Sequence, residues 1–217
     1  MTPLLLIVED DVELGQSLEE LFGAAGLLRI RRFESPHALL ASLTEVYSES
    51  EQAGCLLLDI RLPDMTGAAL FTHLQSLGFS WPVIFMTGHG DLSMAVDLMK
   101  AGAFDYVTKP FDPMGLIEKI KAAMTRSESQ FLDLHFKRMQ SEKLMSLTLH
   151  EREVFARILK NKTTREIADF MGNSTRTIET HRANIFKKMA VNSALQMAQE
   201  HERFVLMGGE TPFPMID

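Results

Sequence analysis

The sequence predicts two successive domains: a doubly wound α/β domain built on a parallel sheet, then a smaller all-α domain. Five short apolar runs alternate with helical patterns up to about residue 125, which is typical of right-handed βαβ units, and no strand pattern follows them. The charge divides at the same place. Residues 1–125 hold 17 Asp and Glu against 8 Lys and Arg, whereas residues 160–188 hold 3 against 7. An acidic first half suits a cation, and a basic patch in the second half suits phosphates.

The composition of the 217-residue chain is that of an ordinary globular protein, with a formal net charge of -7. Its apolar runs are far shorter than the roughly 20 residues that a membrane span needs, and no basic segment opens the chain. We therefore expect a cytoplasmic protein without a membrane partner. The single cysteine, Cys55, excludes an intramolecular disulfide and is expected to be a small core residue.

The five predicted strands are short apolar runs that end in polar or turn residues. Runs without polar alternation are typical of strands that are buried on both faces of a parallel sheet. We expect these strands at residues 4–8, 28–33, 55–58, 83–86 and 105–108.

The helices between these strands show apolar residues at spacings of three and four. The first contains Leu14, Leu18 and Leu21 and is expected to stop at Gly26. The second opens at Ser35-Pro36, where serine is a good N-cap and proline suits the first helical position. A polar stretch at 47–54 is expected to be a loop, and further helices are expected at 67–77, at 92–101 and from about residue 113.

A long helix is the simplest interpretation of the segment from Met114 to about Met145. It contains no strong helix breaker, and its apolar residues keep a helical spacing. Such a helix would cross the boundary between the domains. A flexible tether around residues 125–129 is the alternative.

Two capping boxes open helices in the second half, Thr148 with Glu151 and Thr163 with Glu166. The second of these helices is short and is followed by a turn at residues 172–173. A longer helix then begins after a serine cap at position 174, and a last helix covers about 192–206. The remaining residues, 208–217, contain glycine and proline pairs and are expected to form a flexible tail.

Polar and charged residues follow directly after four of the predicted strands. In open parallel sheets these strand ends share one edge, which is where ligands bind. The residues concerned are Glu9, Asp10, Asp59, Thr87 and Lys109. Crowded carboxylates repel one another unless they share a cation, and Mg²⁺ prefers such oxygen ligands. Asp59 could then attack a phosphoryl group, with Lys109 and Thr87 stabilising its oxygens. Solvated surface acids are the alternative.

Motifs in both halves resemble a known family. In the first half they are Glu9-Asp10-Asp11, Asp59 with Leu62-Pro63-Asp64-Met65-Thr66-Gly67, Thr87-Gly88-His89-Gly90 and Lys109-Pro110-Phe111, which together resemble the receiver domain of two-component response regulators over about residues 3–123. In the second half they are Leu147-Thr148, Glu151-Arg152-Glu153-Val154, Glu166-Ile167-Ala168 and residues 177–184, which look like the LuxR-type helix-turn-helix of the NarL/FixJ family. The chain is thus identified as a member of this family.

The resemblance implies a CheY-like receiver with strand order 2-1-3-4-5 at residues 1–123. A helical linker at 124–145 would join it to a four-helix LuxR-type DNA-binding domain at 146–207, followed by the tail. It further implies a DNA-binding transcription regulator, most simply an activator, whose partners are a sensor histidine kinase, promoter DNA, RNA polymerase and a second copy of the chain.

The resemblance also assigns roles to the residues at the sheet edge. Asp59 would accept a phosphoryl group from the phosphohistidine of the kinase. Glu9 and Asp10 would form the acidic pocket, and Asp10, Asp59 and the carbonyl of Arg61 would hold Mg²⁺. The pair Glu9-Asp10 stands where many receivers have two aspartates.

The same resemblance implies that Thr87 and Lys109 sense the phosphate and that Tyr106 is the aromatic residue that rotates in the switch. The bond between Lys109 and Pro110 is expected to be cis, although few X-Pro bonds are. Phosphorylation would repack a dimerisation face that is made by the helix at 92–101 and the strand at 105–108.

A short helix, a tight turn and a longer helix are the elements that a recognition helix in a DNA major groove requires. By position, Glu179, Thr180 and Ala183 are expected to face base edges. The other candidate DNA-contacting residues are Thr163, Thr164, Arg176, Thr177, Arg182, Lys187 and Lys188, most of them on phosphates. His181 is expected to pack between helices or to contact phosphate.

Two other classes of protein compete with this interpretation. A phosphatase or phosphotransferase that also forms an aspartyl phosphate would need an acid two residues after the nucleophile, where this chain has Arg61. We therefore expect no enzyme beyond a receiver that catalyses its own phosphorylation and dephosphorylation. A regulator whose second half binds protein or RNA is the other competitor, and the basic helix after a tight turn disfavours it.

Overall fold

The computed structural model describes residues 3–27, 29–48, 53–88 and 92–214. The chain divides into two compact units, Met1–Phe131 and Leu132–Asp217, and each is described by itself. Within the described ranges, no helix is both long enough and apolar enough to cross a membrane.

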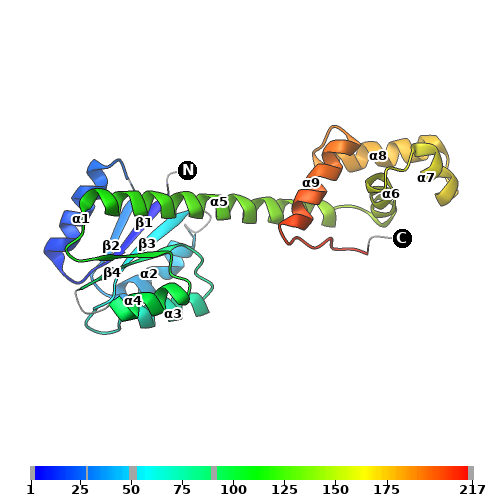
Figure 1. Cartoon of the computed structure of the whole chain (residues 1–217). Helices are drawn as coiled ribbons and strands as arrows, with labels where there is room; N and C mark the ends of the chain where they lie inside the picture. The colour runs from blue at the N-terminus through cyan, green and yellow to red at the C-terminus, as the bar shows by residue number, and fades with distance from the viewer. Residues whose placement is uncertain (1–2, 28, 49–52, 89–91, 215–217) are drawn as a thin grey trace. The chain divides into compact units, whose positions relative to one another are not determined.

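The first unit is built on a five-stranded parallel sheet with the order β2-β1-β3-β4-β5, which confirms the expected receiver topology (Figure 1). Its strands are β1 Leu4–Val8, β2 Ile30–Phe33, β3 Gly54–Asp59, β4 Val83–Thr87 and β5 Asp105–Thr108. The second strand begins at Ile30 rather than at Leu28, which lies outside the described residues. The register sets Val8 beside Leu58 and Asp59 beside Met86, so the carboxyl ends of β1, β3 and β4 meet at one edge.

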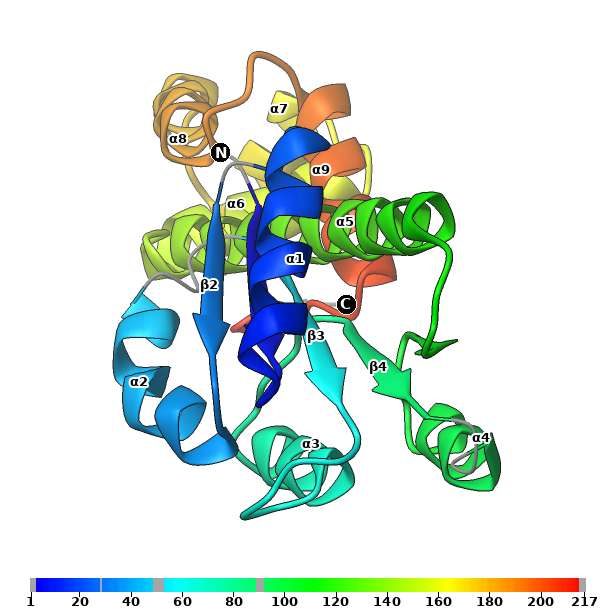
Figure 2. The same cartoon turned by 90° about the vertical axis from the view of Figure 1, so that its left-hand side faces the viewer.

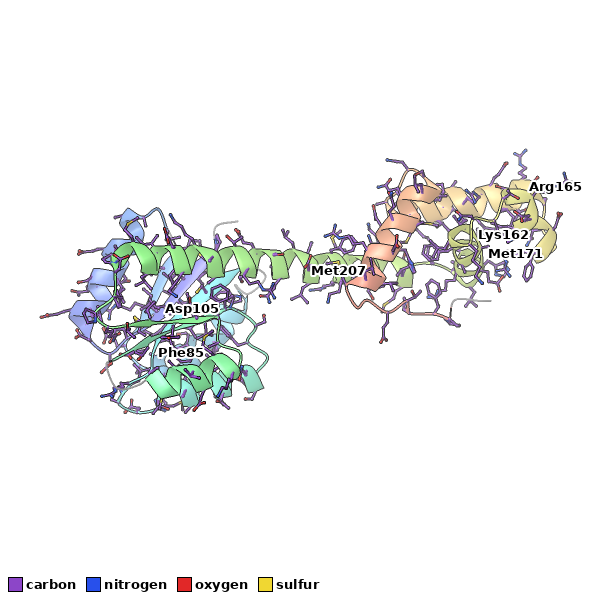
Figure 3. The ribbon with its side chains drawn as sticks, viewed as in Figure 1. Phe85, Asp105, Lys162, Arg165, Met171 and Met207 are labelled. Atoms are coloured by element: carbon purple, nitrogen blue, oxygen red, sulfur yellow. The ribbon has the colours of Figure 1, made fainter. Side chains whose placement is uncertain are left out.

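Five helices cover the two faces of this sheet (Figure 2). They are α1 Val12–Ala24, α2 Pro36–Ser48, α3 Gly67–Ser76, α4 Leu92–Lys100 and the first part of α5 Pro113–Met145. Side chains of α1 and α5 pack on one face around Leu5, Ile7 and Ile84, and those of α2, α3 and α4 pack on the other around Leu6, Leu58 and Phe85, which Figure 3 labels. Burial on both faces explains why β1, β3 and β4 are almost continuously apolar, whereas the edge strands β2 and β5 are only partly buried and carry charged residues.

Two local features add to the expectations from the sequence. The carboxylate of Asp11 caps α1 by accepting from the backbone N–H groups of Glu13 and Leu14. The expected loop at 47–54 overlaps the end of α2 at Ser48 and the start of β3 at Gly54, and residues 49–52 lie outside the described part of the chain.

Helix α4 has apolar residues both in the core and on its outer surface. Ala95 and Leu98 are buried, whereas Val96 and Met99 are 45% and 37% exposed. The side chain of Leu92 lies outside the described set. The structure therefore leaves an apolar strip on the outer surface of α4.

Helix α5 runs from Pro113 to Met145 as one helix of 33 residues and contributes to both units. Residues 125–129 are helical, so the structure has the long helix and not the alternative tether. Ile120 and Met124 pack on the sheet, and the buried hydroxyl of Ser127 accepts from the backbone N–H of Gly54 at 3.0 Å. The first half of the predicted linker is thus packed against the first unit.

The second unit contains the last part of α5 and four further helices, α6 Leu149–Leu159, α7 Thr164–Met171, α8 Thr175–Met189 and α9 Ala194–Leu206. Both predicted capping boxes are present, at Thr148 with Glu151 and at Thr163 with Glu166. Helix α7 ends at Gly172, whose φ of 64° is in the left-handed region that glycine adopts without strain.

The segment after α9 differs from the expected flexible tail. Phe213 is only 8% exposed and packs edge to face on Phe155, with the ring centroids 6.1 Å apart. The hydroxyl of Thr211 also lies 3.0 Å from Nε2 of His201. Residues 208–214 therefore complete the core of this unit, and 215–217 lie outside the described part of the chain.

Candidate functional site

The predicted sheet-edge residues do converge. Glu9 and Asp10 follow β1, Asp59 ends β3, Thr87 ends β4 and Lys109 follows β5. The parallel register brings these positions to the same edge, because each strand ends within one residue of its neighbour.

An ammonium group joins two buried carboxylates at the centre of the site. Nζ of Lys109 lies 2.7 Å from Oε2 of Glu9 and 2.7 Å from Oδ2 of Asp59. Glu9 is 1% and Asp59 6% exposed, whereas Asp10 is exposed at the rim. Each of the three acids offers an oxygen within 4.8 Å of the others. The set is therefore open to solvent on one side and closed on the other.

The buried acids of this site outnumber the cation that pairs with them. Burial raises the pKa of Glu9 to about 7, and the charge of Asp59 adds to this effect, although the hydrogen bond from Lys109 opposes it. Burial works against the charge of Lys109, but its hydrogen bonds to Asp59 and Glu9 outweigh this and raise its pKa. One cation thus serves two buried acids. A second cation at this edge would remove the imbalance.

The backbone after β3 fixes the position of Asp59. Its Oδ1 accepts from the N–H of Arg61 at 3.0 Å, and the N–H of Gly67 donates to the carbonyl of Ile60 at 2.9 Å. A Cβ atom at position 67 would lie 2.1 Å from the carbonyl oxygen of Asp59, so only glycine allows this approach. Gly67 is a supporting residue whose role the sequence pattern did not reveal.

The two switch candidates occupy different environments. Thr87 is fully buried, and its hydroxyl donates to the carbonyl of Gly88 at 2.9 Å. Tyr106 is half-buried and packs against the core cluster on the α4 side of the sheet. The bond between Lys109 and Pro110 is cis, as expected. His89 and Gly90 lie outside the described residues.

Hard oxygen donors make this edge suitable for Mg²⁺. The carboxylates of Glu9, Asp10 and Asp59 form one cluster there, and Mg²⁺ prefers such oxygen ligands while it keeps several waters. Asp10 is exposed, Asp59 retains lone pairs beyond its two hydrogen bonds, and the carbonyl of Arg61 belongs to the adjoining loop. These residues therefore fit the ion that the family resemblance implies.

A second candidate site lies on α8 in the other unit. Ile178, Ile185 and Met189 face the core of this unit. After the first residue of the helix, Thr175, its exposed residues recur at spacings of three and four on the opposite side, and they are Arg176, Glu179, Thr180, Ala183, Asn184 and Lys187. The three expected base-reading residues thus lie on one accessible strip. Asn184 belongs to the strip too, although the sequence did not single it out.

The other expected DNA contacts fall near this strip. Ser174, Arg176, Thr177, Thr180, His181 and Asn184 line a surface hollow at the start of α8. Thr164 begins α7, and Lys162 and Arg165 flank it (Figure 3). The guanidinium of Arg182 lies over the ring of Phe186 at 5.6 Å. Basic groups therefore surround the start of α7 and one side of α8.

Two of the expected phosphate contacts are engaged inside the protein. Nζ of Lys188 donates to Oε2 of Glu151 at 2.6 Å and to the carbonyl of Ser146 at 2.9 Å, so it joins α8 to the start of α6 and to the turn before it. The N–H and hydroxyl of Thr163 both donate to Glu166 in the capping box. The structure thus gives Lys188 two acceptors within the protein and gives Thr163 a capping role.

Comparisons with known proteins cover both units. Residues 5–121 match the family described as "Response regulator receiver domain", and residues 145–200 match "Bacterial regulatory proteins, luxR family". The chain is 34% identical to the response regulator protein TmoT of Ectopseudomonas mendocina, over 92% of this chain and 88% of that protein. It is also 34% identical to the transcriptional regulatory protein FixJ of Rhizobium meliloti (strain 1021), over 95% and 96% respectively. The solved structure of the response regulator StyR is similar with a TM-score of 0.83 and 28% identity, covering 94% of this chain and all of that one.

Proposed function

Because the chain belongs to the NarL/FixJ family of two-component response regulators, which join a receiver domain to a LuxR-type DNA-binding domain, we propose that phosphorylation of Asp59 controls its binding to promoter DNA. The observation that carries this proposal is the position of Asp59 beside Glu9 and Lys109, at the open edge of the sheet. A sensor histidine kinase is the phosphodonor.

Asp59 acts as the nucleophile in this proposal. One of its carboxylate oxygens attacks the phosphorus of a phosphohistidine, the phosphorus–nitrogen bond breaks, and the imidazole leaves. Lys109 already touches Asp59 at 2.7 Å, so its ammonium is within reach of a phosphoryl oxygen there. Asp10, Asp59 and the carbonyl of Arg61 would hold Mg²⁺, which would supply positive charge beside the phosphoryl oxygens.

The switch begins at Thr87. In the unphosphorylated protein its hydroxyl donates a hydrogen bond to the carbonyl of Gly88. On phosphorylation the hydroxyl turns toward the phosphoryl group and leaves space that the ring of Tyr106 can enter. The α4 surface then repacks. Val96 and Met99 are exposed on that surface, which supports a phosphorylation-dependent homodimer through α4 and β5.

A dimer presents two α8 helices to two half-sites of a promoter. Glu179, Thr180 and Ala183 read base edges, because they lie on the exposed strip of α8. The surrounding contacts to phosphate come from Thr164, Arg176, Thr177, Arg182 and Lys187. The bound protein recruits RNA polymerase as an activator.

Intact-mass measurement tests the phosphoacceptor. Acetyl phosphate with Mg²⁺ should add one phosphoryl group to the wild type and none to Asp59→Asn. Asp64→Asn is the matched control, because Asp64 lies in the same loop and its side chain is 59% exposed. Equal labelling of wild type and Asp59→Asn would refute the assignment.

A further inference from the structure

Cationic side chains hold the end of α5 in the second unit. The carbonyls concerned belong to Met145, the last residue of α5, and to Ser146 and Leu147 in the turn that follows it. Arg152 donates to Met145 at 3.2 Å and to Leu147 at 2.9 Å, and Lys188 donates to Ser146 at 2.9 Å. The carboxyl end of a helix carries partial negative charge and unpaired carbonyls, so two cations there satisfy both. We call Arg152 and Lys188, with these three carbonyls, the α5 clamp.

Lys188 also connects the α5 clamp to the start of α6. Its Nζ lies 2.6 Å from Oε2 of Glu151, a side chain that is only 5% exposed. The same oxygen accepts from the backbone N–H of Thr148 in the α6 capping box. A single ammonium in the last turn of α8 therefore binds both the turn directly after α5 and the beginning of α6.

Arg152 connects the α5 clamp to the carboxyl-terminal segment. Its guanidinium lies 4.9 Å from the centroid of the Phe213 ring, which itself packs on Phe155. Further along α5, buried Gln140 donates to Glu200 of α9 at 2.8 Å. The last turns of α5 are thus fixed to α6, α8 and α9, so they belong structurally to the DNA-binding unit.

We propose that Lys188 and Arg152 are positioning residues that carry the effect of phosphorylation to DNA. Lys188 fixes the DNA-reading helix α8 to the turn that ends the linker helix α5, and Arg152 of α6 holds the same turn. The inference rests on the proposed function and deepens it. Helix α5 begins in the receiver unit directly after the Lys109 loop and ends in the α5 clamp. Lys188 acts through α8, because its ammonium already has two acceptors within the protein.

The test compares Lys188→Met with Lys187→Met in the full-length protein. Lys187 is the neighbouring exposed lysine of α8 and is the matched control. Binding to a duplex selected from a random library is measured with and without acetyl phosphate and Mg²⁺, at several salt concentrations. Lys187→Met should flatten the salt dependence by about one unit and keep the gain in affinity on phosphorylation. Lys188→Met should keep the wild-type salt slope and lose most of that gain.

Lys188→Met leaves the buried carboxylate of Glu151 without its cation and can prevent folding, so a second variant is needed. The double variant Glu151→Gln with Lys188→Met removes both charges, and Lys188→Arg keeps a cation at the α5 clamp. A folded double variant should lose the gain and Lys188→Arg should restore it. The proposal is overturned if the double variant keeps the wild-type gain, or if Lys188→Met flattens the salt slope as Lys187→Met does.

Failure of the proposed function is recognised separately, because the wild type itself would then show no gain on phosphorylation. Amide hydrogen exchange of the unphosphorylated protein decides the positioning role in that case. The double variant should speed exchange in the last turn of α8 and at residues 145–148, while exchange in the receiver sheet stays unchanged. Wild-type exchange rates at those amides would overturn the proposal.

Discussion

The two units each contain a buried glutamate that pairs with a lysine, and the two pairs behave in opposite ways. Glu9 lies 2.7 Å from Lys109, and Glu151 lies 2.6 Å from Lys188. Burial raises the pKa of Glu9 to about 7. Burial also opposes the charge of Glu151, but hydrogen bonds from Lys188 and Thr148 outweigh it and lower the pKa of that group.

The number of partners explains this difference. Lys109 is shared between Glu9 and Asp59, so the receiver edge has more buried negative charge than positive charge. Glu151 has a lysine, a backbone N–H and a threonine hydroxyl for itself. A buried carboxylate that shares its only cation with a second acid can bind a further cation. A buried carboxylate whose charge is fully paired holds helices together instead. Similar contacts thus belong to the proposed phosphoacceptor site in one unit and to a structural joint in the other.

The largest expected effect is the difference in stability that results when the charge of Glu151 or of Glu9 is removed. Glu151→Gln should cost the second unit about 3 kcal/mol, because it weakens charged hydrogen bonds at a buried site. Glu9→Gln should cost little or stabilise the metal-free receiver at pH 8, since it relieves repulsion with Asp59. Urea unfolding followed by circular dichroism reports both units, and fluorescence of Trp81, the single tryptophan, reports the first. Equal losses would show that the two pairs do not differ.

The pH dependence of stability should have opposite signs in the two units. The ordinary pKa of glutamate is 4.5, and that of folded Glu9 is about 7, so metal-free receiver stability should fall by about 2–3 kcal/mol as pH rises between these values. The folded pKa of Glu151 is lowered, so its contribution is present above 4.5 and is lost as pH falls through the folded value. Unfolding in EDTA from pH 4 to 8 checks this, with Glu9→Gln as control. An unfolding free energy of the receiver that does not change with pH would contradict this prediction.

A third glutamate, Glu179, sharpens the comparison because it is exposed on α8 and belongs to neither pair. An exposed acid on a DNA-facing helix is unfavourable near phosphate, which suggests that it accepts from a base such as a cytosine amino group. Glu179→Ala should cost about 2 kcal/mol on the preferred site and spare or improve non-specific binding. Uniform loss across a library of duplexes would contradict a reading role.

The smallest effect concerns Mg²⁺. Glu9 must lose its proton for the acidic pocket to carry its full charge, so Mg²⁺ affinity should weaken as pH falls below about 7. One proton per ion corresponds to a tenfold change per pH unit, or about 1.4 kcal/mol. Calorimetric titration between pH 5.5 and 8 measures the slope, and Glu9→Gln should remove it. A slope that persists in Glu9→Gln would assign the proton to another group.

Local signals allowed most of the fold to be predicted. The strand order, the long α5 helix and both capping boxes were predicted from apolar runs, missing breakers and short-range spacing, and from the family resemblance. The convergence of Glu9, Asp59 and Lys109 followed because strand ends meet in a parallel sheet.

The contacts that prediction missed join residues far apart in the chain. Lys188 meets Glu151 and Ser146 only after α5, α6 and α8 have packed, and no spacing within α8 distinguishes it from Lys187. Phe213 was assigned to a flexible tail because its neighbours are glycine and proline, and only the fold reveals its contact with Phe155. Tertiary packing therefore determined the roles that composition left open.

Affinity for a selected DNA site, measured before and after phosphorylation, tests most directly whether the receiver edge controls the DNA-binding unit. The site is selected from random duplexes with the wild-type protein. We expect acetyl phosphate and Mg²⁺ to tighten wild-type binding and to leave Asp59→Asn unchanged, while Asp64→Asn behaves as wild type. An equal gain in Asp59→Asn, or wild-type affinity that does not change when intact mass shows full phosphorylation, would contradict control of DNA binding through Asp59.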